Sequence, residues 1–204
     1  MIKKYFFELL SKYNLSNDKI EDLWLEIEQN YTSKNRYYHT LAHLEHILNQ
    51  LIDVQKEVKD WDTILFSMYY HDIIYDAKAN DNEEKSAKIA ALRMSEIEVP
   101  KHQIETCVAQ ILATKRHLKT ENNDTNLFID ADLSILGQSS DLYIEYYKNV
   151  RKEYKMYPDF LYNLGRKKVL KHFLTMENIF KTPHFNLHFE AHAKLNIQKE
   201  IDIL

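Results

Sequence analysis

The chain contains only two glycines and three prolines in 204 residues, and this scarcity constrains its fold more than any other feature. β-Hairpins and β-sandwiches need many tight turns, and such turns consume Gly, Pro and Asn-Gly pairs. Apolar residues recur instead at helical spacing, as in Ile20, Leu23 and Ile27. The sequence therefore predicts an all-α protein, a single-domain helical bundle with no β-sheet of three or more strands.

The same spacing predicts a series of helices along the whole chain. Their expected ranges are 3–13, 18–27, 41–54, 62–71, 82–94, 101–116, 127–136, 141–155, 160–181 and 186–201. The polar residues 119–126 are expected to form a loop, and Gly137 is expected to end the helix before it. No internal repeat or linker divides the sequence, so residues 1–204 are predicted to form one domain.

Composition narrows the class of partner. A net charge of −4 argues against stable binding of nucleic acid through a basic surface, whereas a small phosphorylated substrate remains compatible. The single cysteine, Cys107, excludes an internal disulfide and a Cys-based zinc site, and its apolar neighbours predict a core residue. No apolar stretch is long enough to span a bilayer, so a cytoplasmic protein without membrane association is expected, as a monomer or a homodimer.

Metal-ligand side chains occur in three separate segments. His43 lies on one predicted helix, His71-Asp72 ends another, and Asp132 lies on a third. Three converging helices could supply two imidazoles and two carboxylates to one ion. Such a set without thiolate suits Mn, Fe, Co, Ni or Zn, and the imidazoles disfavour Mg. The sequence therefore predicts one divalent metal ion and leaves room for a second.

These segments resemble the HD-domain phosphohydrolase superfamily. Tyr38-His39-x-x-x-His43 and Ala131-Asp132-Leu133-Ser134 are similar to motifs of cyclic-nucleotide phosphodiesterases. A longer series resembles a bacterial family of predicted metal-dependent HD phosphohydrolases: 36–39, 71–76, 82–87, 113–117, 130–137, 151–154 and 165–166. The resemblance implies a helical HD-type fold with His43, His71, Asp72 and Asp132 as metal ligands. It favours Asp132 over Asp130, which would face the opposite side of the same helix.

Further residues are candidates for roles beside the ion. By likeness to the phosphodiesterases, His39 is expected to protonate the leaving oxygen, with a hydrogen-bonding or phosphate-steadying role as the alternative. Asp76 could orient a ligand histidine or a water molecule. Candidates for binding phosphate or a second metal are Arg36, Glu83, His117 and Arg151. Their alternatives are surface ion pairs for the arginines and interactions with helix termini for Glu83 and His117.

The predicted function is metal-dependent hydrolysis of a phosphate mono- or diester, with a nucleotide or similar small metabolite as substrate. A di-iron HD-type oxygenase is an alternative, but it needs more histidines between Asp72 and Asp132, where only His102 and His117 occur. A non-catalytic nucleotide-sensing module is the third hypothesis. The C-terminal residues His184, His188 and His192 are expected to have structural roles.

Overall fold

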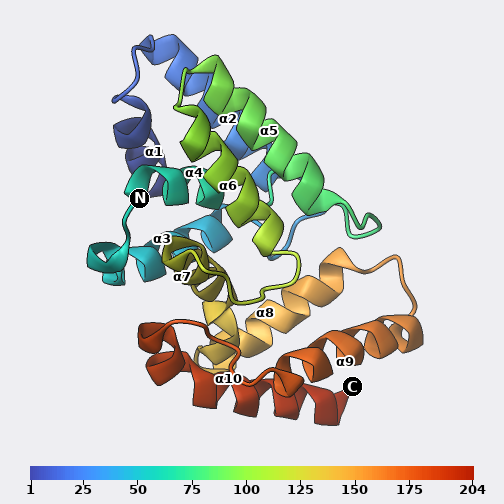
Figure 1. Ribbon diagram of the computed structural model, residues 1–204. Helices are drawn as coiled ribbons and strands as arrows, with labels where there is room; N and C mark the ends of the chain where they lie inside the picture. Colours follow the sequence, from blue (N-terminus) through green and yellow to red (C-terminus); the bar gives the residue numbers. More distant parts are fainter. The chain divides into compact units, whose positions relative to one another are not determined.

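The computed structural model describes all 204 residues and contains ten α-helices, two short 3₁₀ helices and no β-strand, which confirms the all-α class (Figure 1). The bounds are α1 Ile2–Leu10, α2 Asn17–Tyr31, α3 Leu41–Asp53, η1 Gln55–Glu57, α4 Trp61–Tyr70, α5 Asn82–Glu96, α6 Lys101–Ala113, α7 Asn123–Leu133, η2 Ser134–Gly137, α8 Ser140–Glu153, α9 Asp159–Thr175 and α10 Pro183–Ile203. Every helix is too short or too polar to cross a lipid bilayer.

The chain divides into two compact units, and the single domain expected from the sequence remains a prediction. Unit 1 is Met1–Ile129 and unit 2 is Asp130–Leu204. The division falls within α7, which is one continuous helix.

Helix α4 forms the centre of unit 1. All residues from Thr63 to Tyr70 are buried, and the helix packs against α1, α3, α5 and α6. A helix that is apolar on every side is stable only when other elements surround it. Its first turn is capped by Asp60, whose carboxylate accepts the N–H of Thr63 at 3.0 Å. Because α4 is held on all sides, the residues at its C-terminal end have a fixed position.

Helices α5 and α6 lie side by side and cover one flank of α4 (Figure 1). Cys107 of α6 is completely buried there, which confirms the predicted core role. Burial raises the pKa of its thiol to about 12, so the sulfur is protonated and unreactive at neutral pH.

Helix α7 begins earlier than the sequence predicted, because part of the expected polar loop is helical. The side chain of Asn122 accepts the N–H of Thr125 at 3.0 Å and so caps the helix. Asp124 in the first turn accepts the backbone N–H groups of Lys59 and Asp60, at 2.8 to 3.1 Å. These polar residues therefore start a helix and anchor it to the segment before α4.

Unit 2 contains η2 and helices α8, α9 and α10, and η2 packs closely on α10. A Cβ atom added to Gly137 would lie 2.6 Å from both the Cβ and the carbonyl oxygen of Phe189. No glycine has a positive φ angle, so Gly137 does not end a helix through a left-handed conformation. The expected helix stop is thus corrected: α7 ends at Leu133, and Gly137 permits close packing against α10.

The helix predicted over 160–181 ends at Thr175 instead. Two carboxylates hold the segment that follows it. Glu190 accepts the N–H groups of Ile179 and Phe180, each at 3.0 Å. Asp130 accepts those of Lys181 and Thr182, at 2.7 to 2.9 Å. These bonds give the non-helical backbone its partners and lead the chain into α10.

Candidate metal centre

The centre of the predicted site is His71, which directly follows α4 and is 1% exposed. Its Nδ1 lies 2.8 Å from the carbonyl oxygen of Met68, and a carbonyl can only accept a hydrogen bond. Nδ1 must therefore carry a proton. In the neutral ring, the other nitrogen, Nε2, then presents a lone pair, which is the form of histidine that binds metals.

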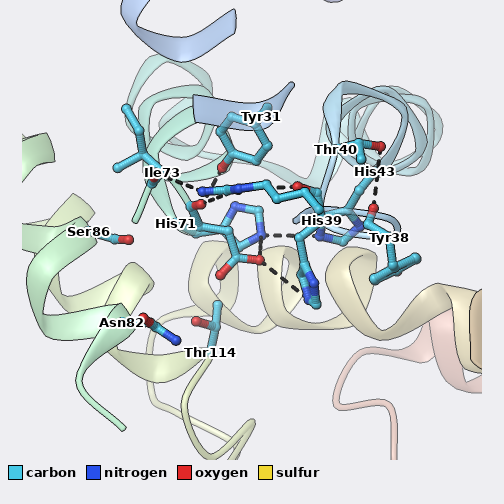
Figure 2. A network of polar contacts seen from close by, with 12 residues as sticks. Tyr31, Tyr38, His39, Thr40, His43, His71, Ile73, Asn82, Ser86 and Thr114 are labelled. Atoms are coloured by element: carbon cyan, nitrogen blue, oxygen red, sulfur yellow. Dashed lines mark hydrogen bonds and ion pairs between the residues drawn. The ribbon is translucent and has the colours of Figure 1, made fainter. Parts of the chain in front are cut away.

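Two further ligand-type atoms lie beside this nitrogen. His71 Nε2 is 3.2 Å from His43 Nε2 and 3.2 Å from Asp72 Oδ2. Figure 2 shows the rings of His43 and His71 turned toward one another at this point. We call these three residues the histidine cluster. Lone pairs that face each other repel unless a positive charge, either a proton or a metal ion, lies among them.

His43 reaches the cluster from α3 and is 4% exposed. Together with Asp132, which lies on α7, His43 and His71 form a group whose ligand atoms all lie within 4.8 Å of one another. This group could hold a metal ion. Asp72 is not part of that group of three, although its carboxylate lies beside His71. The predicted ligands thus comprise a group of three and one adjacent carboxylate.

Asp130, the alternative to Asp132, has a different role within unit 2. It is completely buried, and besides backbone N–H groups its carboxylate accepts the hydroxyl of Thr182 at 2.7 Å. Burial raises its pKa to about 6, although the hydrogen bonds from Lys181 and Thr182 oppose this shift. Its oxygens are used to hold the start of α10.

His39 lies at the edge of the cluster, in the loop before α3. The helix begins at Leu41 with Thr40 as N-cap, so His39 is not one helical turn before His43. Its side chain is 20% exposed, and its Nε2 lies 3.8 Å from Asp72 Oδ2. The ring stacks on Tyr75, with 4.1 Å between the centroids. His39 is thus more accessible than His43, as expected for a group that meets a substrate.

Arg36 was expected to bind phosphate, but its guanidinium group holds the backbone instead. The residue is buried, and Nη1 donates to the carbonyl oxygens of His39 and Asp72 at 3.2 and 2.6 Å. Nη2 donates to the carbonyl of Ile73 at 2.8 Å. These carbonyls belong to irregular backbone around the cluster, and they need donors when they are buried. Arg36 thus has a structural role, and its expected binding of phosphate remains a prediction.

Asp76 and Glu83 make contacts that are common at turns and at the protein surface. Asp76 is exposed, and its carboxylate accepts the N–H of Lys78 at 2.9 Å. Glu83, in the first turn of α5, lies 3.6 Å from the ammonium group of Lys115. Asp76 thus stabilises the turn between α4 and α5, and Glu83 takes part in an ion pair. Their expected roles in catalysis or binding remain predictions.

His117 and Arg151 have structural roles at the ends of helices. His117 has a φ of 51° and its N–H donates to the carbonyl of Ala113, so it closes α6 in the left-handed conformation. Arg151, in unit 2, lies 2.6 Å from Asp159 and 4.7 Å from the ring centre of Tyr162. It lines a hollow of about 390 Å³ in that unit. Binding of phosphate by either residue remains a prediction.

The sequence interpretation missed two aromatic residues beside the cluster. The Tyr31 hydroxyl oxygen accepts the N–H of Asp72 at 3.2 Å, and Tyr75 stacks on His39. Tyr31 lies beyond the predicted helix 18–27, and no local signal marked it. Tyr75 lies three residues after Asp72, and this proximity to the His-Asp pair was the available signal.

Comparison with known proteins gives no match: no protein-family model matches the chain, and neither a curated protein nor a solved structure does. The resemblance to HD-domain proteins therefore rests on the sequence motifs alone. The geometry of the site has to carry the functional argument.

Proposed function

We propose that the chain is a divalent-metal-dependent phosphohydrolase, with His43, His71, Asp72 and Asp132 as ligands. One observation carries the proposal: His71 Nε2, whose lone pair is fixed by the bond from Nδ1 to Met68, faces His43 Nε2 and Asp72 Oδ2 at 3.2 Å each. A divalent cation among these atoms would attract all three of them, because each can present a lone pair. The ligand chemistry fits Mn, Fe, Co, Ni or Zn better than Mg.

The placement of Asp132 on α7 supports its part in the ligand set. Phe128 packs edge-on against the ring of His71, with 5.7 Å between the centroids. Asp132 follows Phe128 by four residues on the same helix, so both side chains project from one face. A carboxylate from α7 complements the two imidazoles and reduces the net positive charge of a bound ion.

The proposed reaction is hydrolysis of a phosphate mono- or diester in a small metabolite such as a nucleotide. A bound divalent ion supplies Lewis acidity toward a phosphoryl oxygen and lowers the pKa of a water ligand. His39, which is partly exposed at the edge of the cluster, would give a proton to the leaving oxygen. Tyr75 would hold the imidazole in orientation by stacking on it.

The oxygenase alternative gains no support from the position of His102. This residue interacts with Asp60, the N-cap of α4, whereas His71 follows the other end of that helix. The ten residues of α4 separate the two ends by about 15 Å. His102 is thus remote from His71. Two irons per chain together with oxygen consumption would nevertheless revive this alternative.

The test measures metal content first and activity second. Protein purified without chelator is analysed for metals, then stripped and titrated with Mn²⁺, Co²⁺, Ni²⁺ and Zn²⁺. We expect one tightly bound ion in the wild type and a loss of binding in His43→Ala. The exposed control His102→Ala should bind the ion as the wild type does. Metal-dependent release of phosphate or nucleotide from a mono- and diester panel completes the test. Absence of binding, or bound metal without any esterase activity, contradicts the proposal.

A further inference from the structure

Arg36 joins the two segments that carry His39 and Asp72. Its Nη1 group is shared between the carbonyl oxygens of these residues, at 3.2 and 2.6 Å. His39 belongs to the loop before α3, and Asp72 to the turn after α4, so they are distant in sequence. A single buried guanidinium group therefore fixes the separation of the two backbone segments.

Asp72 is held by its backbone on both sides. Its carbonyl accepts from Arg36 at 2.6 Å, and its N–H donates to the Tyr31 hydroxyl at 3.2 Å. The carbonyl of Ile73 accepts from Nη2 of the same arginine at 2.8 Å. With both flanking peptide groups tied, the carboxylate of Asp72 can swing only about its own side-chain torsions. Such restraint is what a metal ligand needs if it is to be preorganised.

Aromatic rings continue this connection to His39. The guanidinium carbon of Arg36 lies 4.7 Å from the ring centre of Tyr31 and 5.5 Å from that of Tyr75. Tyr75 in turn stacks on His39. Figure 2 shows the side chains of Tyr31, His39 and His71 in this region. The Arg36 side chain thus contacts Tyr75, which stacks on the proposed proton donor His39, and Tyr31, which bonds to the backbone of the proposed ligand Asp72.

We propose that Arg36 is the positioning residue of the metal centre: it sets the geometry of Asp72 and His39 through their backbones and through Tyr31 and Tyr75. The inference rests on the proposed metal-dependent function and extends it to a residue that does not touch the ion. Lysine cannot replace this arginine, because an ammonium group lacks the planar fork that reaches three carbonyls and lies flat on aromatic rings.

The chain provides a matched control in Arg93. This arginine is also in unit 1 and partly buried, and it makes a bidentate pair with Glu26 at 2.7 Å for each bond. Its partners belong to α2 and α5 rather than to the cluster. Arg36→Lys and Arg93→Lys should therefore both lower the thermal midpoint, whereas only the first should change the metal site.

The experiment compares Co²⁺ and Zn²⁺ affinity by calorimetry, and the visible absorption of the Co²⁺ form, in both lysine variants and in Tyr31→Phe. We expect Arg36→Lys to weaken metal binding about 10- to 100-fold and to shift the Co²⁺ bands, as outer-sphere changes do at other metal sites. Tyr31→Phe should weaken binding less, because it removes one bond and keeps the ring. Arg93→Lys should bind as the wild type does.

Two outcomes overturn the inference, and they are distinguishable. If the wild type binds metal and both Arg36→Lys and Tyr31→Phe bind it equally well with unchanged spectra, Arg36 has only a structural role. If the wild type binds no metal, the proposed function fails and the positioning role fails with it. If Arg36→Lys does not fold, metal binding by Tyr31→Phe provides the test, because this variant retains Arg36 and an aromatic ring at positions 31 and 75.

Discussion

The buried acids of unit 2 and the histidine cluster of unit 1 differ in what surrounds them. In unit 2, Glu200 is 2% exposed and accepts hydrogen bonds from Arg166, at 2.8 and 3.0 Å, and from Tyr143 at 2.5 Å. Asp130 and Glu190 accept backbone N–H groups. In unit 1, the two Nε2 atoms and the Asp72 oxygen that meet at 3.2 Å can each present a lone pair, and each imidazole nitrogen donates or accepts according to its tautomer.

This difference distinguishes polar groups that stabilise the fold from those proposed to bind a metal ion. The carboxylates of unit 2 receive their donors from the protein, so burying them fixes the start of α10 and links α9 to α10. The atoms of the histidine cluster can instead all present lone pairs to a cation. Removal of a residue should therefore cost stability in unit 2 and cation binding in unit 1.

The largest effect is expected for Asp72→Ala. Loss of this carboxylate removes negative charge next to His71, so metal binding and any phosphoesterase turnover should both be lost while the helical circular dichroism persists. The control is Asp62→Ala, which removes an acid of unit 1 that pairs with Lys12. Stoichiometric metal in Asp72→Ala would show that Asp72 is not a ligand, and the proposed ligand set would reduce to His43, His71 and Asp132.

The converse experiment in unit 2 is Arg166→Met, which leaves the buried Glu200 without its cation. Breaking such a pair costs about 3–5 kcal/mol in the free energy of unfolding, because a buried charge loses its partner. Metal affinity should not change. Lys101→Ala, which breaks an exposed pair with Glu105, should change stability by less than about 1 kcal/mol. If Arg166→Met and Lys101→Ala lower the free energy of urea unfolding equally, the structural role of the buried Arg166–Glu200 pair is contradicted.

Features that depend on local chemistry could be predicted from the sequence. The scarcity of Gly and the 3.6-residue spacing predicted the all-α class, and they placed the helices other than α7 and α9 approximately. His43 and His71 were singled out by their motifs. The error at α7 was also local: Asn122 is a good N-cap, but the polar run around it was interpreted as a loop.

The features that could not be predicted depend on contacts between distant residues. The end of α9 is set by Glu190 and Asp130, which capture the following backbone from other elements. The role of Arg36 depends on carbonyl oxygens 36 and 37 residues further along the chain. Nothing in a local pattern shows whether an arginine meets a phosphate or a buried carbonyl, because both are acceptors.

The pH dependence of stability provides a further test of the buried acids of unit 2, through Asp130. Burial raises the pKa of Asp130 to about 6 from its ordinary value of 3.8, so the folded state holds this proton more tightly than the unfolded state. Stability should therefore fall as the pH rises from about 4 to about 6 and then level off, by about 3 kcal/mol from this group. Asp130→Asn should lack this part of the slope in urea unfolding. If the wild type and Asp130→Asn show parallel curves of stability against pH, the raised pKa of Asp130 is excluded.

The smallest effect is expected for substitution of His39, in comparison with His43. His43 is 4% exposed and contacts His71, whereas the side chain of His39 is 20% exposed and stacks on Tyr75. His43→Ala should lose metal, whereas His39→Ala should keep it and lose about 100-fold in rate, because general acid catalysis contributes roughly this much. The loss should shrink for a nitrophenyl ester, since that leaving group needs little protonation.

Comparing an alkyl and a nitrophenyl phosphate in both variants separates proton donation from metal binding. A ligand role for His39 would reduce both rates equally and would be relieved by excess metal. A proton-donor role gives a rate loss that depends on the leaving group and not on metal concentration. If His39→Ala strips the metal and His43→Ala retains it, the roles are reversed, and the more exposed histidine is the ligand.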